Sequence, residues 1–144
     1  MIEGADHEIN FWKQLVKTDR FLNGWLSDEK TPELHNAVYE FILANPNDKV
    51  LDCGSGVCSI LNGTIPNEQL TVCDLLADEY AKIFDYTAHN IVKPFPLACE
   101  DLIYENEFDI VHISNALDHS QKPLLSYRNL LRAVKSGGFL IIQG

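Results

Sequence analysis

A glycine-rich turn and a downstream acidic residue are the clearest candidates for ligand binding in this sequence. Gly54, Ser55 and Gly56 directly follow the apolar run KVLDC, and Asp74 stands 20 residues after Gly54, at the end of the apolar run QLTVC. Glycine lets the backbone turn sharply and approach a ligand closely. In doubly wound folds, an acidic residue at this spacing accepts hydrogen bonds from ribose hydroxyls. The spacing therefore predicts an adenosine-containing ligand; the alternative is that Asp74 only caps the following helix.

Asp118 and His119 are the side chains best suited to acid–base chemistry. A histidine titrates near neutrality, so we take this pair as the candidate general base. The alternative is that His119 caps or packs against the start of the next helix. His112 falls within an apolar run and is interpreted as a core histidine. No two histidines have metal-ligand spacing on one helix face, so the sequence predicts no metal site.

The elements that must position these residues follow a simple order. Apolar periodicity predicts helices over residues 7–17, 31–45, 76–86 and 122–134. Short apolar runs predict strands over residues 49–53, 69–73, 94–98, 108–113 and 139–143. Strands that alternate with helices indicate an α/β fold with a mostly parallel sheet. Such sheets bind ligands at the carboxyl ends of their strands, which is where the glycine turn and Asp74 are expected.

Local signals also predict where the helices begin and end. Asp6 can cap the first helix, and Thr31 can cap the second with Pro32 at its first position. Gly137 and Gly138 are expected to end the last helix. One apolar stripe is predicted on that helix, formed by Leu124, Tyr127, Leu131 and Val134.

Composition excludes several classes of protein. The chain has 144 residues and a formal net charge of −10, which fits one domain and argues against nucleic acid as a partner. No apolar run approaches the roughly 20 residues of a membrane span, and the first residues do not form a secretory signal. The cysteine spacing matches no common zinc motif. We therefore predict a cytoplasmic protein with four reduced, buried thiols, at Cys53, Cys58, Cys73 and Cys99.

The glycine turn also separates two families that bind adenosine. A dinucleotide-binding pattern would need glycine at position 59, where this chain has Ser59, and an apolar residue where it has Asp52. The segment VLDCGSG instead resembles motif I of the class I S-adenosylmethionine (SAM)-dependent methyltransferases, with Cys58 in place of the third glycine. The segments LACEDL (97–102), EFDIVHISNALDHSQKP (107–123) and KSGGF (135–139) continue the resemblance. It covers residues 31–144, and residues 1–30 are expected to form an N-terminal helical cap.

The resemblance implies SAM as the cofactor and assigns roles to individual residues. The turn at residues 54–56 would contact its amino-acid part, Asp74 its ribose and Leu75 its adenine. Residues 99–101 would border the adenine edge, and residues 114–115 would lie near the reacting methyl group. The implied cofactor-binding residues are Asp52, Gly54, Ser55, Gly56, Asp74, Leu75, Cys99, Glu100, Asp101, Ser114 and Asn115.

The resemblance further implies a Rossmann-like doubly wound sheet with strand order 3-2-1-4-5. The family usually has two more strands after the fifth, which we expect to be absent here. The apolar run FLIIQ would then form an edge strand. Because an unpaired apolar edge is a liability in a monomer, we expect a homodimer through this edge.

Three functions are compatible with the sequence. The first, which the resemblance implies, is SAM-dependent methyl transfer to a small-molecule acceptor. The segments NALDHS and DLLADEY resemble a methyltransferase subgroup found in saccharide and polysaccharide biosynthesis, so a saccharide or polysaccharide precursor is the candidate class. The second is a SAM- or adenosine-binding module that is catalytically incompetent because the C-terminal part is missing. The third, an NAD-dependent oxidoreductase, is disfavoured by Ser59 and Asp52.

Overall fold

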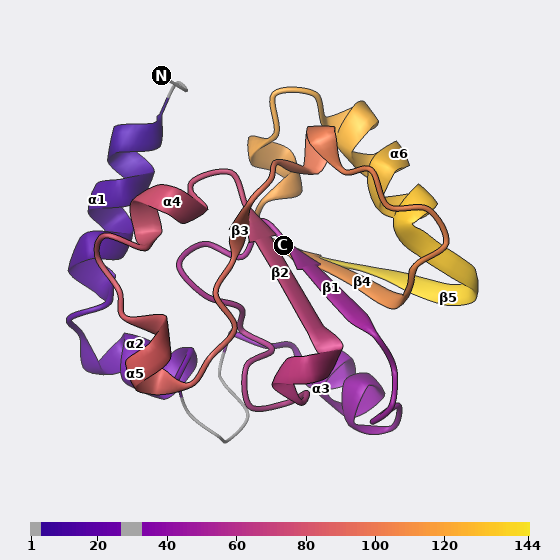
Figure 1. The fold of residues 1–144 in the computed structure, drawn as a ribbon, viewed down its shortest axis with the longest axis horizontal. Helices are drawn as coiled ribbons and strands as arrows, with labels where there is room; N and C mark the ends of the chain where they lie inside the picture. The colour runs from indigo at the N-terminus through magenta and orange to yellow at the C-terminus, as the bar shows by residue number, and fades with distance from the viewer. Residues whose placement is uncertain (1–3, 27–32) are drawn as a thin grey trace.

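A parallel five-stranded sheet forms the centre of the computed structural model (Figure 1), which describes residues 4–26 and 33–144. Its strands are β1 (Val50–Cys53), β2 (Leu70–Asp74), β3 (Phe95–Pro96), β4 (Phe108–Ser114) and β5 (Val134–Gln143). They lie in the order β3-β2-β1-β4-β5, and all of the pairs are parallel. The predicted α/β class and strand order 3-2-1-4-5 are confirmed.

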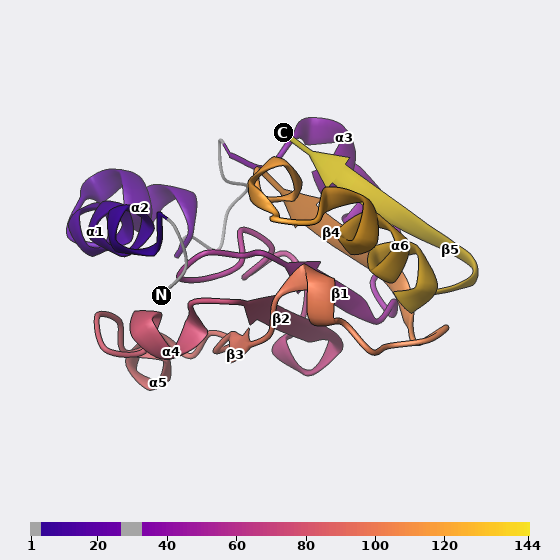
Figure 2. The same cartoon turned by 90° about the horizontal axis from the view of Figure 1, so that it is seen from above.

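Helices cover both faces of this sheet. They are α1 (Ala5–Leu15), α2 (Asp19–Gly24), α3 (Asn36–Leu43), α4 (Ala77–Tyr80), α5 (Tyr86–His89) and α6 (Pro123–Ala133). Short 3-10 helices occur at η1 (Asn67–Gln69), η2 (Cys99–Asp101) and η3 (Leu117–His119). Figures 1 and 2 show α1, α2, α4 and α5 gathered on the side of the molecule opposite α6 and β5.

Strand alternation divides the buried side chains into two clusters. Val50 of β1 and Ile110 of β4 point toward α3, into one cluster, whereas Leu51 and Val111 point toward α6, into the other. The central strands are buried on both faces, which explains their continuous apolar runs. The same alternation places Asp52 on the α3 face and Cys53 on the α6 face.

The N-terminal helices begin at different residues from those predicted. The first begins at Ala5, with Gly4 rather than Asp6 at the capping position. The third begins at Asn36, because the His35 Nδ1 atom accepts a hydrogen bond from the Ala37 backbone N–H and caps the helix. The predicted cap at Thr31 and Pro32 lies outside the described residues.

The helix predicted over residues 76–86 is not continuous. Only Ala77–Tyr80 is α-helical there, and α5 starts separately at Tyr86. The Asp85 side chain accepts the Ala88 backbone N–H and caps this second short helix, so a new helix begins at Tyr86.

The last helix turns a different face inward from the one predicted. Its buried side chains are Ser126, Asn129, Leu130 and Ala133, whereas Leu124, Tyr127 and Leu131 are exposed. Buried Ser126 and Asn129 both have hydrogen-bond partners around η2 and η3, so the polar face can lie inside. Gly137 and Gly138 do not end this helix, because β5 has already begun at Val134.

In the described parts of the chain, no helix has the length and apolar character needed to cross a membrane.

Candidate cofactor and acceptor site

The glycine turn follows β1 and is fixed to the neighbouring strand. Gly54 and Gly56 have φ angles of 69° and 71°, in the left-handed region that side chains rarely adopt. The Cys73 carbonyl of β2 accepts backbone hydrogen bonds from Gly54 at 2.8 Å and Ser55 at 3.3 Å. A side chain at Gly54 would also meet Ala116, which follows β4. The turn therefore lies where the ends of β1, β2 and β4 meet.

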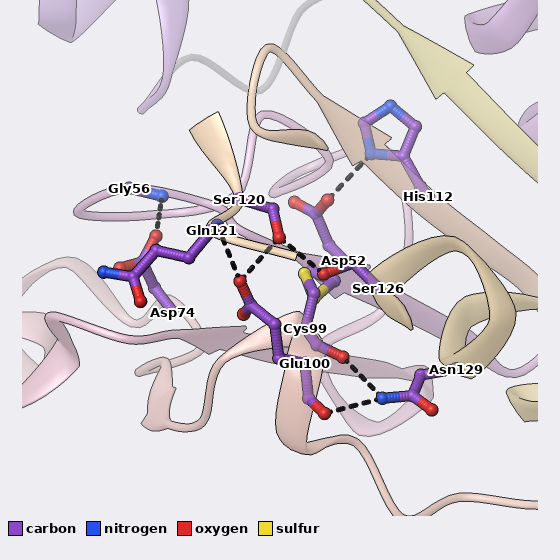
Figure 3. Close-up of a disulfide and its surroundings, with 11 residues drawn as sticks. Asp52, Gly56, Asp74, Cys99, Glu100, His112, Ser120, Gln121, Ser126 and Asn129 are labelled. Atoms are coloured by element: carbon purple, nitrogen blue, oxygen red, sulfur yellow. Dashed lines mark hydrogen bonds and ion pairs between the residues drawn. A yellow bond between two sulfur atoms is a disulfide. The ribbon is translucent and has the colours of Figure 1, made fainter. Parts of the chain in front are cut away.

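Asp74, the last residue of β2, faces this turn. Its Oδ2 atom accepts the Gly56 backbone N–H at 2.9 Å (Figure 3), and its Oδ1 atom accepts the Leu76 backbone N–H, also at 2.9 Å. Burial raises the pKa of Asp74 to about 6, although both backbone hydrogen bonds lower it. The neighbouring Leu75 side chain is partly exposed. Asp74 is thus held beside the turn, with further acceptor lone pairs for a ligand.

Asp52 lies beneath the turn and is almost fully buried. Strand register pairs it with His112, whose Nδ1 atom is 2.8 Å from Asp52 Oδ1, and Ser59 Oγ donates to the other carboxylate oxygen at 2.5 Å. Gln143 Nε2 lies 2.7 Å from His112 Nε2 and must donate to it, because Gln143 Oε1 accepts the His35 backbone N–H. Both ring nitrogens of His112 therefore have partners inside the fold, and the prediction of a core histidine is confirmed.

Two of the four cysteines are joined, which corrects the prediction of four reduced thiols. Cys53 and Cys99 form a disulfide, with Cα atoms 6.5 Å apart. The disulfide can form because Cys53 and η2, which contains Cys99, lie on the same face of the sheet within bonding range. Cys58 and Cys73 are buried thiols, as predicted. Burial raises the pKa of both thiol groups well above the usual range.

Glu100 and Asp101, predicted to border the adenine, have different surroundings. The Glu100 Oε1 atom accepts hydrogen bonds from Ser120 Oγ at 2.5 Å and the Gln121 backbone N–H at 3.0 Å (Figure 3). Partial burial opposes ionisation, but these hydrogen bonds hold the pKa of Glu100 below its usual value. Asp101 is exposed. Glu100 thus ties η2 to the segment that leads into α6.

Ser114 and Asn115 line a surface hollow of about 500 Å³ at the carboxyl ends of β4 and β5. Asn115 adopts a left-handed conformation (φ 52°), and its backbone N–H donates to the Gln143 carbonyl. The remaining lining residues are Glu33, His35, Val38, Ile142, Gln143 and Gly144. The hollow has the size of a small-molecule site, and its lining residue Asn115 directly precedes Ala116, which a side chain at Gly54 would meet.

Asp118 and His119, the residues predicted to act as general base, lie at the surface. Asp118 and His119 sit on η3, and their side chains are 78% and 77% exposed, with Oδ2 and Nε2 3.8 Å apart. Neither residue lines the hollow beside Ser114. The exposed pair and the hollow are therefore separate features of the strand-end edge.

The structure also brings residues to this edge that sequence reasoning did not select. Glu33 and His35 line the hollow, and Trp12 of α1 packs on Gly56. The Glu33 Oε2 atom is buried without a hydrogen-bond partner among the described residues. These residues precede the first strand and belong to no motif, so only the packing of the N-terminal helices identifies them.

A family model described as a methyltransferase domain matches residues 51–142, which run from β1 to β5 and include the glycine turn and Asp74. The chain belongs to this methyltransferase family. No curated protein sequence matches this methyltransferase domain.

Solved structures share the methyltransferase fold at low sequence identity. A Methanococcus maripaludis protein described as a SAM-dependent methyltransferase has a TM-score of 0.66 at 14% identity, over 99% of this chain and 64% of its own. The [4+2]-cyclase SpnF has a TM-score of 0.63 at 16% identity, over 96% and 58%. The trans-methyltransferase CalH in complex with S-adenosylhomocysteine (SAH) has a TM-score of 0.55 at 18% identity, over 73% and 35%. This methyltransferase domain thus spans 35–64% of the length of those chains.

SAM is the cofactor that class I methyltransferases use, and the residues at the turn fit it. A positive-φ glycine turn can approach the amino-acid part closely. The Asp74 carboxylate at the end of β2 offers acceptors for ribose hydroxyls. When bound, SAM supplies a methyl group activated by a sulfonium cation, and this acidic chain can accommodate that charge.

Proposed function

We propose that this chain binds SAM at the glycine turn and takes part in methyl transfer to a small-molecule acceptor. The observation that carries the proposal is the hydrogen bond from Gly56 to Asp74, which joins the turn after β1 to the acid at the end of β2. Together they form the glycine–acid pair that an adenosine ligand requires. Family membership from β1 to β5 supports methyl transfer rather than hydride transfer.

The hollow beside Ser114 supports the proposal that the acceptor is a small molecule. Its size suits a small molecule. Its lining combines polar groups from Glu33, His35 and Asn115 with apolar Val38 and Ile142, a mixture that suits a polyhydroxylated acceptor such as a saccharide. Methyl transfer to a hydroxyl forms an O–C bond as the C–S bond breaks, and it mainly requires positioning of the two substrates.

A hydroxyl acceptor also needs a group that takes its proton, and two candidates are available. Glu33 lines the hollow with an unpartnered carboxylate oxygen, whereas His119 and Asp118 lie at the surface. We favour Glu33 because it lines the hollow; its Oε1 atom pairs with Arg20 at 3.4 Å, so acting as a base requires the side chain to turn its buried Oε2 atom toward the acceptor. With an acceptor in hand, Glu33→Gln should lower kcat by roughly 10²–10⁴-fold, and His119→Asn should leave kcat unchanged; the reverse result would assign the base to His119.

Calorimetric titration tests the cofactor assignment. The purified chain is titrated with SAM and SAH, with NAD as the control ligand. We expect saturable binding of SAM and SAH and none of NAD. Asp74→Ala should weaken SAM binding by roughly 1–3 kcal/mol, the value of hydrogen bonds to a charged group. Binding of NAD instead, or equal SAM affinity in a folded Asp74→Ala variant, would reject the proposal.

Turnover separates the enzyme from a binding module. Mass spectrometry of hydroxyl compounds incubated with SAM and the chain should show a product heavier by one methylene group, with SAH formed in equal amount. SAM binding without product across the acceptor panel would favour the catalytically incompetent module.

A homodimer is our proposal for the partner. β5 is an edge strand of the described sheet, and its Phe139 and Ile142 side chains are about half exposed. Exposed Leu124, Tyr127 and Leu131 add an apolar stripe on α6, the helix packed against the β4–β5 side of the sheet. Pairing of two β5 strands would satisfy the open edge of both copies.

A further inference from the structure

The N-terminal helix α1 places an aromatic side chain directly on the glycine turn. Gly56 has no side chain, and the Trp12 indole fills the space that one would occupy: a methyl group built at Gly56 would overlap the Trp12 ring. Trp12 is 7% exposed, and its Nε1 atom donates to Glu8 Oε1 of the same helix at 3.0 Å. The indole also makes edge contacts with Tyr80 of α4 and Trp25.

Trp12 covers the part of the glycine turn that is proposed to bind the cofactor. Gly56 donates its backbone N–H to Asp74, so the residue covered by Trp12 is also the one that links the turn to the acid. Burial raises the pKa of Asp74, with the charge of Glu8 on α1 adding to the effect. Two hollows on the described surface, of about 500 and 420 Å³, are lined by neither Gly56 nor Asp74. A cofactor at the turn must therefore displace the indole or share its space.

The attachment of α1 allows such a displacement. A short segment at residues 16–18 joins α1 to α2, where Thr18 caps the next helix through its side chain. Beyond this segment Phe21 is fully buried, stacks on Trp25 and contacts Phe84 edge-on, so α2 keeps contacts of its own when the edge contact between Trp12 and Trp25 is lost. Movement about residues 16–18 would lift Trp12 from the turn and leave the sheet intact.

We propose that Trp12 is a residue of the cofactor site: its indole covers Gly56, and α1 lifts to admit SAM and then closes on it. The inference rests on the proposed SAM site at the turn. It makes α1 the element that controls the rate of cofactor entry, and it gives the N-terminal helices a role in ligand binding beyond packing.

The two tryptophans of the chain, Trp12 and Trp25, make a direct test possible. In Trp25→Phe, Trp12 is the single reporter; in the matched control Trp12→Phe, Trp25 is. Titration with SAH should change the emission and acrylamide quenching of Trp12 saturably, with the dissociation constant found by calorimetry. Because Trp25 contacts the side chain at position 12 only edge-on and does not lie on Gly56, its emission in the control should change less than that of Trp12.

Stopped-flow mixing with SAH tests the order of events. In Trp25→Phe the observed rate should level off at high SAH concentration, because lifting of α1 becomes limiting. In Trp12→Ala, followed by displacement of a fluorescent SAH analogue, association should be roughly ten-fold faster, since a larger fraction of molecules is open.

The outcomes separate this inference from the cofactor assignment. Calorimetric binding of SAH with no change in Trp12 emission or quenching would overturn the role of Trp12 and leave the SAM site standing. Binding to Trp12→Ala alone would support a lid that is closed most of the time. No binding to the wild type or to any folded variant would overturn the cofactor site itself, and this inference with it.

Discussion

At Asp74, burial and ligand binding act on the same carboxyl group in opposite directions. Burial raises its pKa from 3.8 to about 6, so the native state binds more protons than the unfolded state between these values. The free energy of unfolding therefore falls as the pH rises from about 4 to 6. Asp74→Asn removes the ionisable carboxyl group but leaves one oxygen for the two backbone N–H groups of Gly56 and Leu76, so the difference in free energy of unfolding between pH 4 and pH 7 should be smaller in this variant than in the wild type. Urea unfolding at both pH values measures this, with exposed Asp101→Asn as the control.

SAM binding should shift the same equilibrium. Ribose hydroxyls donate to the ionised carboxylate and therefore favour proton release from Asp74. We expect SAM affinity to fall as the pH drops below about 6. Calorimetry near pH 6 in buffers of different protonation enthalpy should show proton release in the wild type and none in Asp74→Asn. Affinity that is independent of pH between 5 and 7 would contradict the ribose contact.

The Asp52–His112 pair is the second residue-scale test. Both side chains are buried, and Asp52 retains only Ser59 when the imidazole is removed. His112→Phe should lower the free energy of unfolding by about 1–3 kcal/mol, because the buried Asp52 side chain loses a hydrogen-bond partner. His119→Phe, at an exposed position, is the matched control. Similar midpoints of denaturation for the two variants would show that Asp52 does not depend on His112.

Among the helices and loops, Glu100 should act as a structural clamp. It binds Ser120 and the backbone before α6, and these hydrogen bonds depress its pKa. This contribution to stability is present above the unfolded pKa and is lost as the pH falls through the folded value. Glu100→Gln should lower the free energy of unfolding by about 1 kcal/mol at pH 7, and exposed Glu105→Gln by almost nothing. Equal melting temperatures would refute the clamp.

Strands were easier to predict than helices for a physical reason. The runs KVLDC, QLTVC and FDIVHI are buried on both faces, so their composition alone indicates a strand. Helix α6 instead buries Ser126 and Asn129. Asn129 donates to the carbonyls of Cys99 and Glu100 in η2, about 30 residues earlier in the chain. Ser126 pairs with Ser120, just after η3. The sequence does not show that these turns lie beside the helix. No periodicity of apolar residues could reveal that face.

Some residues of the candidate site could also be predicted from the sequence, and others could not. Glycines and an acid after predicted strands located the turn and Asp74, because sheet topology brings strand ends together. Trp12 and Glu33 come from the segments before β1. Their position depends on how those segments pack, which a strand-based motif does not specify. The Cys53–Cys99 bond was missed because sequence distance gives no indication that the two residues share a face.

For the whole molecule, β5 determines the expected state of association. Ile142→Lys places a charge on the edge strand, where it should prevent pairing of two copies. Light scattering should give twice 16.3 kDa for the wild type and 16.3 kDa for the variant. Lys135→Ala, at the start of the same strand, controls for general effects. A wild-type mass of 16.3 kDa at high concentration would refute the homodimer.

Strand order also has a consequence for how the chain is made. β1 lies between β2 and β4, and Val50 pairs with Ile110, so one neighbour of the central strand follows it by about 60 residues. At roughly 5–20 residues per second, translation leaves one apolar edge of β1 without its partner for several seconds. During that interval the nascent chain exposes the strand that carries the glycine turn. Chaperone capture of ribosome-bound chains that stop between β2 and β4 is therefore expected to exceed capture of chains that extend beyond β4.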